Sequence, residues 1–205
     1  MSSKAVNGEV TLVIDPYQNE TGLRFPRTLE AHIIATSHNG EDASNVEGVQ
    51  APQDAKPFVV DLPGEYEVKG LFVYGFPAPL KERKEEHRIF RIEVEGITIV
   101  HLGALNRPLT DKETQELGAV DVLILPVGGG RVMNADTATE VIEQVEPRLV
   151  IPCTFALPNI KEKLAEIDLF CKAIGSCQRE ESARLKLTRK DLPEEDMIVK
   201  VLTRE

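Results

Sequence analysis

The chain has 205 residues, of which 41% are hydrophobic and 28% charged, a composition typical of soluble globular proteins. Its net charge of -10 would repel a phosphate backbone, which argues against nucleic-acid binding. No apolar run approaches the ~20 residues needed to span a bilayer, and the start, MSSKAVNGE, lacks the apolar segment of a signal peptide. We therefore expect a cytoplasmic protein with no membrane partner.

The three cysteines, Cys153, Cys171 and Cys177, form no regular disulfide framework. Cys171 and Cys177 do not have CxxC spacing either. We predict packed or surface thiols in a reducing compartment.

β-branched and alternating runs predict strands in the first half of the chain. A strand over 10–14 ends at Pro16, and a second strand over 31–36 lies between polar loops at 17–29 and 39–56. An antiparallel meander is predicted next, with strands over 58–62, 66–68, 71–74, 89–94 and 97–102.

Helical patterns and buried strands alternate in the second half. Thr110 and Glu113 form a capping box that opens a helix ending near Gly118, and Asn134 or Asp136 caps another that ends near Val145. A third helix is predicted over 160–174, with strands over 120–127, 149–152, 185–188 and 198–202. This order predicts one α/β domain, 1–205, in which two mixed sheets pack face to face between outer helices as a four-layer αββα sandwich.

The loop ATSHNGEDASN, residues 35–45, has the form of a metal-binding loop that lacks part of its ligands. A His-x-His-x-Asp-His loop supplies imidazole and carboxylate groups, which Zn²⁺ prefers. In this register the chain has His38, Gly40, Asp42 and Ala43. Glycine and alanine carry no donor atom, so two of these positions cannot bind a metal ion.

These features together resemble the metallo-β-lactamase-fold hydrolases, and within them a branch of predicted Zn-dependent hydrolases. The resemblance rests on the order and spacing of the loop at 35–45 and five further segments: IDP at 14–16, PGEYE at 63–67, VEGITIVHLGAL at 94–105, VDVLILPVGGG at 120–130, and VIPC at 150–153 before Thr154.

The resemblance implies a dinuclear site that holds zinc, iron or manganese. In the family, an HLGDL motif supplies a bridging Asp and an Ile-Pro-x-His strand end supplies the last His; this chain has Ala104 and Thr154 there. A lone His of the family would fall near 77–80, where the chain has none. Only His38 and Asp42 keep ligand types, so we expect no bound metal and no other cofactor.

The remaining histidines are expected to have structural roles. His101 lies beside the lost bridging Asp, and the resemblance implies that it supports the ligands rather than binds the metal. His32 and His87 match no ligand position, so we expect them to be packing residues. A Ser-His-Asp device from Ser37 or Ser44 with His38 and Asp42 is not expected, because neighbours on one loop seldom reach the required geometry.

The glycines Gly128, Gly129 and Gly130 could bind an anion through backbone N–H groups at the rim of the cleft. A turn that needs positive φ explains them more simply. The turn at 63–67 is predicted to be structural and is a candidate for subunit contacts in a homo-oligomer. The family's opening Gly-His strand has no counterpart in MSSKAVNGE, which predicts an exposed or differently paired sheet edge.

Three functions remain open from the sequence. The first is a catalytically degenerate member of the fold, a pseudoenzyme that acts through binding or assembly. The second is an active hydrolase with a relocated, reduced or intersubunit metal site. The third is a metal-free binder of a small ligand at the old cleft.

Overall fold

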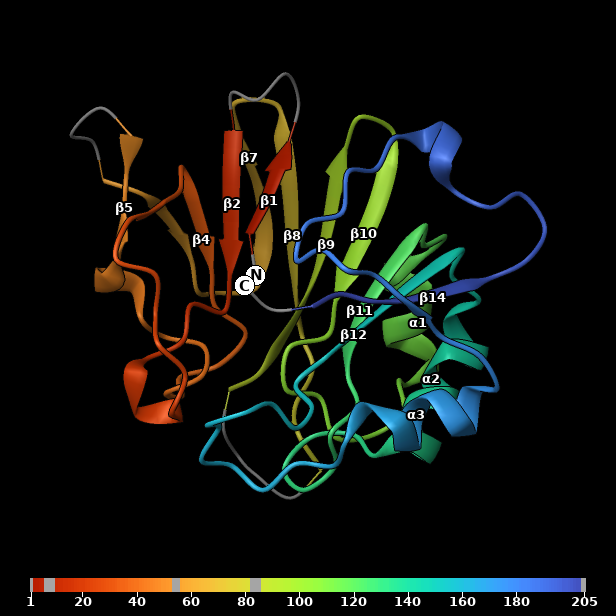
Figure 1. Ribbon diagram of the computed structural model, residues 1–205. Coiled ribbons are helices and arrows are strands. Elements are labelled where there is room, and N and C mark those ends of the chain that lie inside the picture. The colour runs from red at the N-terminus through yellow and green to blue at the C-terminus, as the bar shows by residue number, and fades with distance from the viewer. Residues whose placement is uncertain (1, 6–9, 53–55, 82–85, 204–205) are drawn as a thin grey trace.

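The computed structural model describes residues 2–5, 10–52, 56–81 and 86–203, and its strands form two large sheets (Figure 1). The smaller sheet contains β1 (Ser2–Ala5), β2 (Val10–Ile14), β4 (Ile33–Ala35) and β6 (Phe58–Val60), in that spatial order. The larger sheet contains β7 (Gly64–Val68), β8 (Leu71–Pro77), β9 (Arg88–Val94), β10 (Ile97–His101), β11 (Val122–Pro126), β12 (Leu149–Cys153), β13 (Gln178–Arg179) and β14 (Ile198–Val201).

Both sheets are mixed, as the sequence predicted. In the smaller sheet, β2 pairs antiparallel with β1 and parallel with β4. The larger sheet has the order β13-β14-β12-β11-β10-β9-β8-β7, with an antiparallel meander from β7 to β10 and parallel pairs from β10 to β13.

The core between the sheets fixes the ends of β2 and β4, where the candidate site begins. Leu12 and Ile33 of the smaller sheet belong to one apolar cluster with Val73 and Phe90 of the larger sheet. All four side chains are buried. Removal of this apolar surface from water drives the sheets together, so the predicted sandwich is confirmed.

The helices cover one outer face only in the part of the chain that the structure describes. The helices α1 (Asp111–Leu117), α2 (Ala135–Val145) and α3 (Ile167–Ile174) lie on the larger sheet (Figure 1). The smaller sheet is instead covered by a two-stranded ribbon, β3 (Leu29–Glu30) and β5 (Val49–Gln50), and by its flanking loops. Short 3-10 turns, η1 (Asn19–Thr21), η2 (Val46–Gly48) and η4 (Arg189–Asp191), lie in loops of the described residues.

In the second half, one predicted helix starts later than expected and one predicted strand is absent. The helix predicted over 160–174 begins only at Ile167, because the preceding backbone bonds elsewhere: the N–H of Lys161 donates to Thr21 O, and that of Ala165 to Gly128 O. The segment 185–188 is not a strand. Its Leu185 and Leu187 instead pack on the face of β11 and β12 that the smaller sheet leaves uncovered.

The N-terminal edge and the cysteines also differ from expectation. β1 pairs with β2 in the register Ser2↔Val13, so the strand that MSSKAVNGE was predicted to lack covers the edge beside β2. Backbone pairing needs no side-chain motif, which is why residue types alone do not predict this strand. Cys171 and Cys177 form a disulfide, which corrects the predicted free thiols, whereas Cys153 is free.

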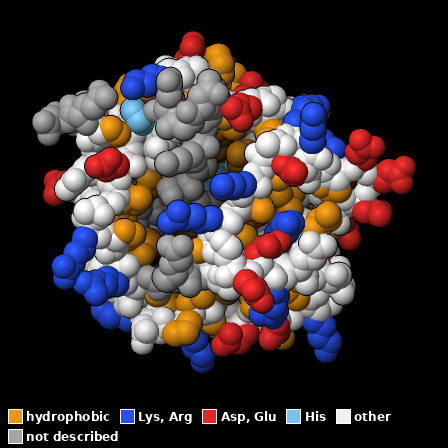
Figure 2. All heavy atoms as spheres, turned by 45° about the horizontal axis from the view of Figure 1, so that its top comes forward, with side chains coloured by type: hydrophobic (Ala, Val, Ile, Leu, Met, Phe, Trp, Pro, Cys, Tyr) orange, Lys and Arg blue, Asp and Glu red, His pale blue; other side chains and the backbone are white. Residues whose placement is uncertain are grey.

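No helix among the described residues is long and apolar enough to cross a membrane. On the face shown in Figure 2, the described Lys and Arg side chains are interspersed with Asp and Glu rather than gathered in one patch.

We predict that the Glu113 carboxylate is a main stabilising contact of α1. Its oxygens accept two N–H bonds from Arg107, at 2.6 and 2.8 Å, and one from the backbone of Thr110 at 2.8 Å. Glu113 is 5% exposed, so Glu113→Ala leaves a half-buried guanidinium uncompensated and should lower the free energy of unfolding by about 3 kcal/mol.

Urea unfolding measures this change. The matched control is Glu116→Ala on the same helix, where the pair with exposed Lys112 spans 3.6 Å and should matter by less than ~0.5 kcal/mol. Equal losses for the two variants would contradict the role given to Glu113.

Candidate functional site

The loop after β4 is anchored by Asp15 at the end of β2. Because β2 and β4 are parallel neighbours, their carboxyl ends meet at the same edge of the sheet. Asp15 Oδ1 accepts the backbone N–H of Ser37 at 2.7 Å, and Oδ2 accepts its hydroxyl at 2.8 Å. Burial raises the pKa of Asp15, although the bonds from Ser37 oppose this shift.

Ser37, His38 and Asp42 lie in one hydrogen-bonded row, which corrects the expectation that one loop would not bring them together. His38 Nδ1 lies 2.9 Å from Ser37 Oγ, and Nε2 lies 3.0 Å from Asp42 Oδ1. Ser37 is fully buried, its hydroxyl donates to Asp15, and it does not line the cleft. The row therefore cannot present a serine nucleophile to a substrate. Ser44 donates its hydroxyl to Gly40 O instead.

Arg131 holds the outer side of this row. Its Nη2 donates to Asp42 Oδ2 at 2.6 Å, and its Nε donates to Glu162 Oε1 at 2.7 Å. Burial alone would raise the pKa of Asp42, but the hydrogen bond and charge of His38 and the charge of Arg131 lower it to about 2. Asp42 is therefore ionised and paired at neutral pH.

Two further histidines are buried behind the loop. The His87 ring centroid lies 6.0 Å from that of His38; His87 Nδ1 bonds Ala78 O at 2.8 Å, and Nε2 accepts the backbone N–H of Ala104 at 3.0 Å. His101 Nδ1 accepts the N–H of Gly103 at 3.1 Å and lies 3.9 Å from Asp15 Oδ2. Burial lowers the pKa of His87 to about 4 and that of His101 to about 3.

Of the four positions where the resemblance implies ligands that the chain lacks, Ala43 and Ala104 are closed by packing, whereas Thr154 lines the neighbouring cavity. Ala43 is fully buried and Ala104 is 4% exposed. A Cβ added at Gly40 would lie 2.8 Å from His38 Nε2 and from Asp42 Oδ1. Thr154 has a φ of 50°, an uncommon conformation for a β-branched residue.

The donor groups present do not fit the metal that the fold family implies. Both nitrogens of His38 are already engaged, Nδ1 with the Ser37 hydroxyl and Nε2 with the Asp42 carboxylate, so neither can bind a metal ion without breaking a hydrogen bond. Both oxygens of Asp42 and both nitrogens of His87 are likewise engaged. Among the described residues, no group of three or more His, Cys, Asp or Glu is arranged to hold a metal ion.

A cavity of about 600 Å³ lies beside Asp15 and Asp42, and we call it the old cleft. Its charged and polar lining includes Asp15, Asp42, His101, Arg131 and Glu162, and its apolar lining includes Phe155. Its size suits a small organic ligand.

The glycine run lies beside this cleft but does not line the cavity. Gly129 and Gly130 have φ values of 71° and 67°, and the N–H of Gly129 donates to Met133 O. Gly128 has no room for a side chain, because a Cβ there would lie 2.3 Å from Thr154 O. Conformation and close packing thus account for all three glycines, and the Gly129 N–H is not free for an anion.

Two residues of the site were missed by the sequence reasoning. Arg131 follows the glycine run directly, and its place at the predicted rim was the signal that could have identified it. His87 was expected to be a packing residue outside the site, and no sequence signal places it. The backbone bond from Arg88 N–H to Ser37 O brings it beside His38, and such long-range pairing is not visible in a single sequence.

Comparisons with known proteins agree with this fold. A model described as β-lactamase superfamily domain matches residues 4–154. A UPF0173 metal-dependent hydrolase of Pyrococcus abyssi is 31% identical over 120 residues, which cover 55% of this chain and 52% of that relative. The match thus spans about half the length of that relative. Its counterpart in Thermococcus kodakarensis is 25% identical, with 72% of this chain and 78% of the relative covered.

Solved structures extend the similarity to almost the whole chain. A crystal structure from Thermotoga maritima, named for zinc-dependent hydrolysis within the metallo-β-lactamase superfamily, superposes with a TM-score of 0.79 at 27% identity, over 98% of this chain and 94% of that one. A metallo hydrolase of Ignicoccus hospitalis gives a TM-score of 0.56 at 20% identity, over 83% and 84% of the two chains, and shows the shared fold alone.

We predict that His87 and His101 make the protein less stable as the pH falls below ~6.5. Both are neutral in the folded state, with pKa values of about 4 and about 3, whereas in the unfolded chain they bind protons below ~6.5. The free energy of unfolding should be unaffected by them above ~6.5 and should fall by up to ~1.4 kcal/mol per pH unit for each histidine below it.

Urea unfolding between pH 7.5 and 5, with His87→Gln as the comparison, measures that slope; the variant should lose about half of it. Imidazole NMR titration of the native protein gives an independent check. A His87 or His101 ring that protonates near pH 6.5 in the folded protein would contradict the prediction.

Proposed function

The chain belongs to the β-lactamase superfamily, and from that premise we propose that it is a metal-independent member that no longer catalyses hydrolysis and acts by binding. The site in question is the cleft beside Asp42. At the positions where the resemblance implies further ligands of a dinuclear site the chain has Gly40, Ala43, Ala104 and Thr154, and the Arg131 guanidinium is fixed on Asp42.

The single observation that carries the proposal is the guanidinium of Arg131 between Asp42 and Glu162. Two neighbouring carboxylates are stabilised by a cation between them, which a metal ion or an arginine can supply. With Arg131 in place, a divalent cation at Asp42 would be repelled by the guanidinium that is hydrogen-bonded to the same carboxylate. The paired arginine therefore favours the metal-free form of the site.

The replaced positions support the same conclusion. The Ala104 backbone N–H donates to His87, so the segment that carries the bridging Asp in the family here fixes a neutral imidazole. Movement of a few side chains would not restore ligands at Gly40, Ala43, Ala104 and Thr154, because none of these residues has a group that coordinates zinc well.

A ligand-binding role at the old cleft has one specific observation in its favour. The cavity of about 600 Å³ is lined by both apolar and polar side chains. Such lining is typical of small-molecule sites. Binding at this cleft is therefore the second part of the proposal, whereas hydrolysis by a relocated or intersubunit metal site is the alternative that the next experiment tests.

We predict that the protein binds zinc only weakly, and that Arg131 is one reason. Isothermal titration with zinc would compare the wild type, the single variant Arg131→Ala, the fourfold variant Gly40→His/Ala43→His/Ala104→Asp/Thr154→His, and the fivefold variant that combines them. The variant with all five substitutions, here called the fivefold variant, should have a zinc affinity about 10 to 100 times that of the variant with four, the fourfold variant. The reason is that removal of the guanidinium frees an oxygen of Asp42.

Each other outcome contradicts a specific part of the proposal. Stoichiometric zinc in wild-type protein purified without chelator would overturn the metal-independent proposal and favour a relocated or intersubunit site. Equal affinities of the fourfold and fivefold variants would show that Arg131 does not oppose the metal. A folded fivefold variant that binds no zinc would show that the four positions are wrongly assigned.

A further inference from the structure

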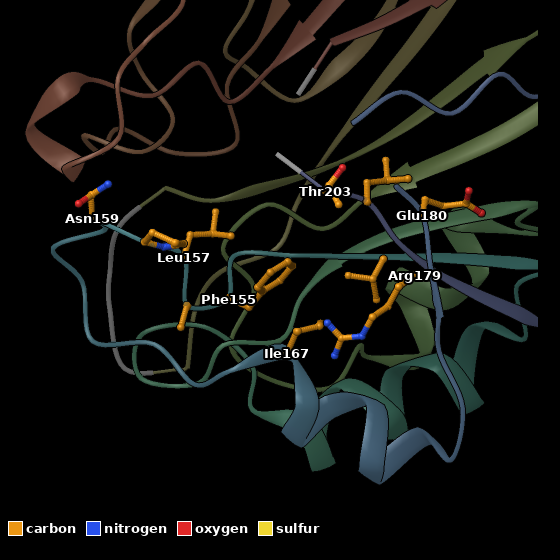
Figure 3. Close-up of a pocket in the computed structure, with 11 residues that line it drawn as sticks. Phe155, Leu157, Asn159, Ile167, Arg179, Glu180 and Thr203 are labelled. Atoms are coloured by element: carbon orange, nitrogen blue, oxygen red, sulfur yellow. The ribbon is translucent and has the colours of Figure 1, made fainter. Parts of the chain in front are cut away.

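A second cavity, of about 530 Å³, lies beside the loop that follows β12 (Figure 3). We name it the C-terminal pocket; its walls are the loop 155–159, Ile167 of α3, Arg179 and Glu180, and the chain end 201–203. Phe155 and Leu157 line this pocket and also the old cleft. The two cavities therefore share one wall but are separate sites.

Most of the pocket wall is apolar. Phe155, Leu157, Ile167, Val201 and Leu202 all contribute, and Figure 3 shows Phe155, Leu157 and Ile167 around the opening together with Arg179. Apolar walls with few polar groups are typical of sites for small organic molecules, and the volume lies in the usual range. The wall thus suits a ligand with an apolar body.

The charges at the pocket favour an anionic group on that ligand. Glu180 Oε1 is already paired with Lys200 Nζ at 2.8 Å, so the acidic side chain that lines the pocket among the described residues is compensated. Arg179 pairs with Asp168, whose side chain is 78% exposed and does not line the pocket. Such exposed pairs contribute little to stability, and a guanidinium has five N–H donors, so Arg179 can also donate hydrogen bonds to a carboxylate in the pocket.

The walls are held in place before any ligand binds. The disulfide between Cys171 and Cys177 ties α3 to the segment that leads into β13. The N–H of Glu180 donates to Val201 O, and the N–H of Ala156 donates to Ala165 O. A site on fixed elements loses little entropy when it binds, which favours affinity.

We propose that the C-terminal pocket binds a small carboxylic acid with an apolar body, with the carboxylate on Arg179 and the apolar part against Phe155, Leu157 and Val201. The site is independent of the remnant metal loop, so the zinc experiments and the experiment below can fail separately.

Decanoate, decylamine and 1-decanol, each below its micelle-forming concentration, test this site by titration calorimetry and amide NMR on the whole chain. Decanoate should bind at about tenfold higher affinity than either of the other two, and its shifts should centre on residues of the pocket. Arg179→Gln should lower decanoate affinity about tenfold, and Arg179→Lys less. Lys172→Gln is the matched control, because it removes an exposed cation of α3 outside the pocket and should leave affinity unchanged.

A second variant tests the apolar part without touching the charge. Ala156 lines this pocket but not the old cleft, so Ala156→Trp should fill it and abolish decanoate binding. Its melting temperature and amide spectrum show whether the variant is folded. Equal binding of decanoate and decylamine, unchanged affinity in folded Arg179→Gln, shifts confined to the old cleft, or no binding of decanoate would each overturn the proposal.

Discussion

The ion-pair bridge of Arg131 is the contact on which the arrangement of the cleft depends. It joins the loop after β4, through Asp42, to the segment before α3, through Glu162. In metal-dependent hydrolases of this fold a metal ion supplies positive charge at such a loop. Here the cation is part of the chain, so the loop can be ordered without a cofactor.

This bridge also explains how His38 and Asp42 have structural roles in a loop without the other ligands. His38 links Ser37 to Asp42, and Asp42 in turn accepts from Arg131. The row begins at Asp15, which is fixed by the end of β2. Buried polar groups are costly when unpaired, and in this row each one has a partner. The two remaining ligand types therefore stabilise the loop in their own right.

Much of the fold could be predicted from the sequence because its signals are local. The run VDVLILPV indicates a strand buried on both faces, and Thr110 with Glu113 indicates a helix start; both are found in the structure. The assignment of Gly40, Ala43, Ala104 and Thr154 as positions without ligands is a prediction from residue type alone. Predicting these features does not require knowing which distant segments of the chain contact one another.

The features that could not be predicted depend on contacts between segments that are distant in sequence. Asp42 and Arg131 are far apart in sequence, and only the packed sheets bring them within one hydrogen bond. His87 reaches the site because the backbone N–H of Arg88, at the start of β9, donates to Ser37 O in the loop at 35–45. Residues before Ile167 have helical periodicity, but their backbone groups bond other loops, and tertiary contacts override the local preference.

Anomalous diffraction at the zinc edge, from crystals of the wild-type protein grown with excess zinc, shows whether Arg131 or a metal ion occupies the Asp42 carboxylate. We predict no zinc peak at His38 and Asp42, and density for the Arg131 guanidinium on the Asp42 carboxylate. A zinc peak bonded to Asp42, with Arg131 displaced from it, would show that Arg131 does not take the place of a metal ion.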